Sequence, residues 1–247
     1  DQRFLDLCDE MGLYVWEESH ARNVDFHHPA YRKQIEDSTR EMILQHRTHP
    51  SIVIWGALNE CDARTAAGRR EYARILNLMR KLDDSRPVTF ADNTWEKNRC
   101  AGLVDIVSWN VYTGWYGNQG PEYTRERLEE LLKWLRSGAS KGGRGKPVII
   151  SEFGGGAIYG NRNPSRVRWS EEYQAEILDH ALMTYLNHPA VSGAAIWQFA
   201  DCRVTEENQW WFRRPRTYNN KGTVDEYRRP KLCYEIVKKR MNEAKGG

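Results

Sequence analysis

The sequence predicts an α/β fold that is part of a (β/α)8 TIM barrel. Short apolar segments alternate along the chain with longer segments of helical spacing, an order typical of a parallel sheet built from βαβ units. Polar residues follow the apolar segments, as they do at the active-site rim of such a barrel. The consecutive glycines from Gly154 to Gly156 lack the G-x-G-x-x-G spacing of a phosphate-binding loop, which disfavours a doubly wound nucleotide-binding fold.

Length and composition predict one domain over residues 1–247. The hydrophobic content of 40% is enough for a full core, and (β/α)8 barrels commonly reach this length. The net charge of +3 is too small to indicate a nucleic acid or an anionic membrane as partner. No apolar run is long enough to span a membrane, in agreement with the mean hydropathy of -0.78.

The cysteines and histidines indicate no metal site. No C-x-x-C pair and no H-E-x-x-H spacing occurs, so we assign no metal and no cofactor. A disulfide framework is not indicated either, because the cysteines lie far apart. We expect buried free thiols at Cys8, Cys61, Cys100, Cys202 and Cys233.

In the first half of the chain, strands are expected at 13–17, 52–58 and 88–90. Helical spacing begins with the first residues, and Gly12 is a predicted C-cap. We therefore expect that residue 1 lies inside a helix and that further sequence precedes it, so the cellular compartment is not predicted. A second helix runs from Pro29 to Pro50, which cannot continue it. The third carries apolar residues at helical spacing: Tyr72, Ile75, Leu76, Met79 and Leu82.

In the second half, strands are expected at 105–110, 148–152 and 193–199. The helix between the first two is predicted from four leucines at helical spacing: Leu128, Leu131, Leu132 and Leu135. The next helix ends before Pro189, and four of its residues are predicted to lie on one side: Tyr173, Ile177, His180 and Thr184. A terminal helix is predicted from Leu232, Ile236 and Val237.

Two predicted strands end in a glutamate, Glu60 and Glu152. Burying an unpaired charge is costly, so such a carboxylate is paired, exposed in a cleft, or functional. Two carboxylates at one rim suit glycosidic bond cleavage, in which one protonates the leaving oxygen and the other attacks the anomeric carbon. For either glutamate alone, a salt bridge is an equally good interpretation. Polar residues at strand ends are Glu17, Asn59, Glu60, Asp92, Asn110, Glu152 and Asp201.

Residues near these glutamates are candidates for sugar binding. Asn59 supplies an amide that could hold a sugar hydroxyl beside Glu60. Aromatic rings pack on the C–H faces of pyranoses, although most aromatic residues in any chain belong to the core. The candidates in or beside predicted loops are Tyr112, Trp115, Trp197, Trp210 and Trp211.

Several segments together resemble the catalytic barrel of glycoside hydrolase family 2, the β-galactosidase and β-glucuronidase family: 55–60, 109–116, 150–154, 169–174 and 195–201. The resemblance implies that Glu60 is the acid/base on the fourth barrel strand and Glu152 the nucleophile on the seventh. It also implies that Tyr112 donates a hydrogen bond to the nucleophile. The implied activity is hydrolysis of terminal β-glycosidic bonds by retaining double displacement, with the two carboxyl groups about 5 to 5.5 Å apart.

The resemblance also implies a longer parent protein. The first two barrel strands of the family and its β-sandwich domains have no counterpart in residues 1–247, so we expect an N-terminally truncated fragment that covers strands three to eight. The expected partners are a carbohydrate substrate and the missing N-terminal domains, and a homo-oligomer is possible.

Two elements bear on the sugar. The segment from Asn110 to Tyr116 resembles the aromatic loop of β-glucuronidases, and Asn219-Asn220-Lys221-Gly222 resembles their asparagine-x-lysine element, which holds a uronate carboxylate. A neutral-sugar enzyme, a β-galactosidase above all, stays open as an alternative, as does a non-catalytic carbohydrate-binding fragment. The candidate substrate-binding residues are Asn59, Asn110, Tyr116, Trp197, Asn219 and Lys221.

Overall fold

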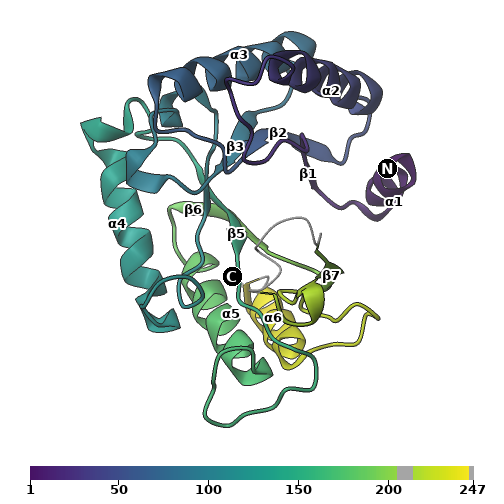
Figure 1. The fold of residues 1–247 in the computed structure, drawn as a ribbon, viewed down its shortest axis with the longest axis vertical. Helices are drawn as coiled ribbons and strands as arrows, with labels where there is room; N and C mark the ends of the chain where they lie inside the picture. The colour runs from purple at the N-terminus through teal and green to yellow at the C-terminus, as the bar shows by residue number, and fades with distance from the viewer. Residues whose placement is uncertain (205–213, 245–247) are drawn as a thin grey trace. The chain divides into compact units, whose positions relative to one another are not determined.

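The computed structural model describes residues 1–204 and 214–244, and helices alternate with strands as predicted (Figure 1). The helices are α1 (Gln2–Met11), α2 (Tyr31–His46), α3 (Ala66–Leu82), α4 (Thr124–Arg136), α5 (Glu171–Tyr185) and α6 (Leu232–Ala244). The strands are β1 (Val15–Glu18), β2 (Ile52–Asn59), β3 (Val88–Asp92), β4 (Val107–Asn110), β5 (Val148–Phe153), β6 (Val191–Ile196), β7 (Cys202–Arg203) and β8 (Tyr218–Asn219).

In the described part of the chain, six strands form one sheet in chain order from β1 to β6. The strand pairs from β1 to β4 are parallel, for example Glu17 opposite Trp55 and Asp92 opposite Trp109. The parallel βαβ arrangement predicted from the sequence is therefore confirmed. The sequence did not predict the small antiparallel sheet of β7 and β8, in which Cys202 lies opposite Asn219.

The chain divides into two compact units, and each is described by itself. The first unit comprises Asp1–Trp109 and Leu131–Ile149, and the second comprises Asn110–Glu130 and Ile150–Gly247. Glu60 belongs to the first unit and Glu152 to the second. The predicted separation of their carboxyl groups therefore stays a prediction.

In the first unit, α2 and α3 lie side by side, and α3 packs on β2 and β3 (Figure 1). The predicted apolar face of α3 is buried at Tyr72, Ile75, Leu76 and Met79. Full burial of such side chains contributes about 1.5 to 3 kcal/mol each. Helix α1 ends at Gly12, whose φ of 66° is the left-handed C-cap expected from the sequence.

In the second unit, α5 packs along α6 (Figure 1). The side of α5 predicted from the sequence is only partly buried, because Ile177 is buried, His180 is exposed and Thr184 is half-buried. The buried residues repeat one turn apart in pairs, which turns the face away from His180: Ile177, Leu178, Ala181, Leu182 and Tyr185.

The cysteines are free, and all but one are buried as predicted. Burial raises the pKa of the Cys61 thiol to about 11 and those of Cys100 and Cys233 to about 12, which keeps these thiols protonated. The prediction is wrong for Cys202, which is exposed because it lies on the two-residue strand β7. Over residues 1–204 and 214–244, no helix has the length and apolarity that a membrane crossing requires.

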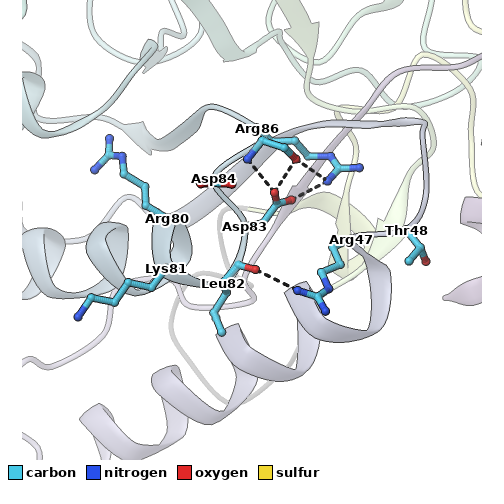
Figure 2. A pocket seen from close by; sticks show the side chains of 9 residues that line it. Arg47, Thr48, Arg80, Lys81, Leu82, Asp83, Asp84 and Arg86 are labelled. Atoms are coloured by element: carbon cyan, nitrogen blue, oxygen red, sulfur yellow. Dashed lines mark hydrogen bonds and ion pairs between the residues drawn. The ribbon is translucent and has the colours of Figure 1, made fainter.

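A pocket of about 400 Å³ lies where α2 and α3 end, at the amino ends of β2 and β3 (Figure 2). Figure 2 shows the Arg86 guanidinium pointing at the carboxylate of Asp83, with an N···O distance of 2.6 Å. Burial acts to raise the pKa of Asp83, but hydrogen bonds from Ser85, Trp55 and Arg86 outweigh it and lower the pKa to about 2. This pocket lies where two helix ends meet two strand starts, at the end of β2 opposite to Glu60.

We expect Asp83→Asn to lower the free energy of unfolding by about 2 kcal/mol at pH 7. A carboxylate whose folded-state pKa lies below its unfolded value stabilises the fold above the unfolded pKa. That contribution disappears as the pH falls from about 4 to about 2. Urea unfolding between pH 2 and 7 measures both effects.

The control is Asp84→Asn, the same change at the exposed neighbour in the same pocket, for which we expect less than about 0.5 kcal/mol. Two outcomes contradict this account of Asp83. One is an equal loss of unfolding free energy in the two variants. The other is a loss of stability between about pH 4 and about pH 2 that is as large in Asp83→Asn as in the wild type.

Candidate active site

Glu60 follows the last residue of β2 in the first unit and has a left-handed backbone, with φ of 51°. Its N–H donates to the carbonyl of Ala91 on β3 at 2.9 Å, so the sheet still holds this residue. Such a conformation costs a non-glycine residue on the order of 1 kcal/mol and is common at functional sites. The side chain is only 11% exposed.

Arg22 holds the Glu60 carboxylate, a contact that the sequence did not predict. Its Nη2 and Nε donate to Oε2 of Glu60 at 2.8 and 3.3 Å. The backbone of Arg22 forms a bridge with Asn59, whose N–H donates to the carbonyl of Ala21 at 2.9 Å. The loop after β1 is thus hydrogen-bonded beside Asn59 and Glu60, and it places the guanidinium of Arg22 next to the Glu60 carboxylate.

Two other strand-end carboxylates of the first unit serve the local structure. Glu17 bonds Nδ1 of His46 on α2 at 2.6 Å, so it contacts the covering helix and the prediction of a rim position is wrong. Asp92 is 2% exposed and accepts hydrogen bonds from Thr94 and from the N–H of Trp95. Burial raises the pKa of Asp92, and these hydrogen bonds oppose the rise.

Glu152 lies on β5 in the second unit, next to the predicted aromatic loop. The hydroxyl of Tyr112 donates to Oε2 of Glu152 at 2.5 Å. The N–H of Val111 donates to the carbonyl of Glu152 at 2.8 Å. Asn110, which is 1% exposed, accepts a hydrogen bond from Ser151 at 2.7 Å. The hydrogen bond that the resemblance implied for Tyr112 is thus present, and neighbouring backbone contacts fix the loop against β5.

Trp197 follows β6 and is 39% exposed, so it offers a ring surface beside the end of β5. Its carbonyl oxygen would lie 2.8 Å from a Cβ at position 154, where Gly154 has φ of 147°. Only glycine permits this approach of the two backbones. Trp115 is wrong as a sugar-stacking candidate because it is 1% exposed and packs against Trp169. Trp210 and Trp211 lie outside the described residues.

Lys221 and Asn219 lie near Tyr116 in the second unit. The Nζ of Lys221 donates to the Tyr116 hydroxyl at 2.9 Å, although Lys221 is only 2% exposed. Arg214, which the sequence analysis missed, reaches Oδ1 of Asn219 at 3.4 Å and the Tyr116 hydroxyl at 3.5 Å. Two cationic groups therefore converge on the Tyr116 phenol, and one of them, Arg214, also contacts the Asn219 amide.

Aromatic rings surround the ammonium of Lys221. Its Nζ lies 5.3 Å from the ring centroid of Tyr112, 5.5 Å from Trp115 and 4.9 Å from Tyr116. These distances are within the range of cation–π attraction, which contributes about 2 kcal/mol or more when the cation is desolvated. Tyr112 thus links two groups, because its ring faces the ammonium and its hydroxyl binds Glu152.

The two units therefore offer different chemistry. The first holds a carboxylate beside a guanidinium and the Asn59 amide, and the second holds a carboxylate bonded to a phenol beside a buried cation. The second set can bind an anionic group near an ionised carboxylate. Among residues 1–204 and 214–244, no cluster of three histidine, cysteine, aspartate or glutamate side chains is arranged to hold a metal ion.

Comparison with known proteins places the chain in a described family. Residues 1–245 match the model of "Glycosyl hydrolases family 2, TIM barrel domain". The rat β-glucuronidase is 30% identical over 259 residues, which cover 99% of this chain and 38% of the rat protein.

Solved structures agree. A β-galacturonidase from Eisenbergiella tayi bound to galacturonate superposes with a TM-score of 0.93 and 45% identity, over 98% of this chain and 43% of the other. The β-D-glucuronidase of Dictyoglomus thermophilum gives a TM-score of 0.88 and 26% identity, over 98% and 43%. The predicted fold class, part of a TIM barrel, is confirmed. The chain spans about two fifths of the length of these relatives.

Proposed function

Because this chain belongs to glycosyl hydrolases family 2, through the TIM barrel domain of that family, we propose that the protein is a retaining β-uronidase. The observation that carries the proposal is the buried ammonium of Lys221, which Tyr112 joins to the candidate nucleophile Glu152. A cation beside the nucleophile favours a substrate whose sugar carries a carboxylate.

The reaction follows from the roles of the two glutamates. Glu152 attacks the anomeric carbon while Glu60 gives its proton to the departing glycosidic oxygen, which leaves a glycosyl ester on Glu152. Glu60 then takes a proton from water, and the resulting attack on the anomeric carbon frees Glu152 with net retention. Asn59 and Asn110 supply amide groups for the sugar hydroxyls, and Trp197 supplies a stacking surface.

Recognition of the uronate rests on Lys221 and Asn219, with Arg214 as an added cation. The phenol of Tyr116 lies within 3.5 Å of both the Arg214 guanidinium and the Lys221 ammonium. A carboxylate that meets these donors gains charge-assisted hydrogen bonds, each worth about 1.5 to 3 kcal/mol. A neutral hydroxymethyl group at the same place lacks the charge that these donors complement.

An aryl β-glycoside panel assayed with the full-length gene product tests the proposal. We expect both the β-galacturonide and the β-glucuronide to be hydrolysed well ahead of the β-galactoside. We expect the galacturonide to lead, because the identity of 45% to the β-galacturonidase exceeds the 26% to 30% to the two β-glucuronidases compared above. A preference for the galactoside supports the β-galactosidase alternative, and inactivity on the whole panel supports a non-catalytic carbohydrate-binding role.

Glu152→Gln should abolish turnover without unfolding the protein, since the amide keeps the size but loses the nucleophile. Glu60→Ala should slow release of poor leaving groups far more than of activated aryl groups, because only the poor ones need protonation. Steady-state kinetics over aryl groups of graded acidity measure this difference. Equal losses for all leaving groups would remove Glu60 from the acid/base role, and proton NMR showing inversion of the product anomer would reject the mechanism.

Tyr112→Phe should raise the lower apparent pKa of the pH–rate profile. The phenol donates to the ionised carboxylate of Glu152, so it stabilises the charged form and keeps the nucleophile deprotonated at lower pH. The profile of kcat/KM for an aryl β-uronide between pH 3 and 8 measures the shift. The matched control is Tyr123→Phe, whose hydroxyl donates to the exposed carboxylate of Glu130 on α4, outside the candidate site. An acidic limb that stays in place excludes Tyr112 from this task.

Lys221→Ala should lower kcat/KM for the aryl β-uronide by about 10-fold to 150-fold, the equivalent of about 1.5 to 3 kcal/mol. The matching neutral glycoside should change little, because it has no carboxylate to lose contact with. The control is Lys239→Ala, an exposed lysine on α6. A parallel fall for both substrates would show that Lys221 does not select the uronate.

A further inference from the structure

We propose that the buried ion pair between Asp201 and Lys231 is a positioning device that sets the ammonium of Lys221, and thereby determines selectivity for a carboxylate. The proposal rests on the function proposed above and assigns a role to Asp201, which the sequence analysis had placed at the rim. In the structure Asp201 is 4% exposed, so that prediction is wrong, and its carboxylate is directed into the protein.

Lys231 holds the peptide on the amino side of Lys221. Its side chain is fully buried, and its Nζ donates to three oxygens. These are Oδ1 of Asp201 at 2.8 Å, the carbonyl of Ala157 at 2.7 Å and the carbonyl of Asn220 at 3.1 Å. Asn220 directly precedes Lys221. The carbonyl of Asn220 also accepts a hydrogen bond from the N–H of Ala157 at 2.9 Å, so two donors fix this peptide.

Asp201 holds the peptide on the carboxyl side. The Oδ1 that binds Lys231 also accepts the N–H of Gly222 at 2.8 Å, and Gly222 directly follows Lys221. The packing is tight here, since a Cβ on Gly222 would lie 2.3 Å from the backbone nitrogen of Asp201. One ion pair therefore fixes the residues on both sides of Lys221.

Gln174 of α5 connects the same segment to the residues that follow β5, the strand of Glu152. Its Nε2 donates to the carbonyl of Gly222 at 3.0 Å and to that of Gly155 at 2.9 Å. The carbonyl of Lys221 itself accepts the N–H of Gln198 at 3.1 Å. The backbone from Asn220 to Gly222 is therefore anchored at each residue, and the anchors lead back to the segments after β5 and β6.

The energetics favour a positional role over a contribution to stability. Burying two charges costs several kcal/mol for each ion, so a buried pair often stabilises no more than apolar side chains of similar volume. Burial raises the pKa of Asp201, and the charge of Lys231 opposes that rise. The pair instead fixes the position of the backbone around Lys221, because its hydrogen bonds to three oxygens and one N–H allow a single geometry. A binding group displaced by about 1 Å can cost on the order of 100-fold in rate.

The test compares Asp201→Asn and Lys231→Met with the wild type in the full-length gene product. The readout is the ratio of kcat/KM for an aryl β-uronide to kcat/KM for the matching neutral glycoside. We expect the ratio to fall about 10-fold to 100-fold, because the Lys221 ammonium is displaced while Glu152 and Tyr112 remain bonded. Asp179→Asn is the matched control, since it removes the same charge from an ion pair with Arg240 that joins α5 to α6. There the ratio should not change.

Each outcome decides between the alternatives. A purely structural pair would lower the melting temperature and reduce both activities together, which overturns the proposal. If Lys231→Met does not fold, Asp201→Asn decides alone, since it keeps the side-chain volume and removes only the negative charge that holds the Lys231 ammonium. A wild type without preference for the uronide rejects the proposed function itself. A wild-type preference that Lys221→Ala abolishes and Asp201→Asn leaves intact rejects only the positioning role.

Discussion

Burial of charged side chains next to the ends of parallel strands is the constraint on which the candidate site depends. An ionised group taken out of water costs several kcal/mol unless donors or acceptors of the protein replace the lost hydration. Glu60 receives a guanidinium from the loop after β1, Glu152 receives a phenol, and Asp201 receives an ammonium and a backbone N–H. The loops that follow these strands are therefore shaped by the partners that the carboxylates require.

The aromatic loop shows how this constraint reaches into the packing. Arg168 stacks on Trp115, with its guanidinium carbon 4.0 Å from the ring centroid, and donates to the Trp115 carbonyl at 2.8 Å. The hydroxyl of Tyr173 on α5 donates to the carbonyl of Gly114 at 2.6 Å. These contacts hold the turn that presents Tyr112 to Glu152 and Tyr116 to Lys221. Trp115 contributes as a buried support of the loop, although its place in sequence suggested a sugar-binding surface.

The sequence predicted the elements of the fold because their signals are local. Apolar runs and helical spacing gave the six strands and the helices between them, with ends displaced by a few residues, as at 193–199 against Val191–Ile196. The family resemblance implied the hydrogen bond between Tyr112 and Glu152, but local patterns do not predict side-chain partners, because these depend on distant residues. Arg22 and Glu60 are 38 positions apart, and Arg214 and Tyr116 are 98 apart. For the same reason a strand-end position alone could not separate Glu152 from Asp201, whose partner Lys231 lies on another segment.

The candidate groups for chemistry and for selectivity are held by different physical means. Glu60 and Glu152 are attached to strands whose backbone is fixed by sheet hydrogen bonds, which is the most rigid support that the fold offers. Lys221 lies beyond the two-residue strand β8, where fewer backbone hydrogen bonds hold the chain, and a mobile backbone there would spread the ammonium over several positions. A cation that is only loosely placed attracts any anion, whereas one held at a single point can distinguish a carboxylate from a hydroxyl at that point. The buried pair of Asp201 and Lys231 gives this segment the rigidity that the sheet gives to the glutamates, and it does so through contacts that need not touch the substrate.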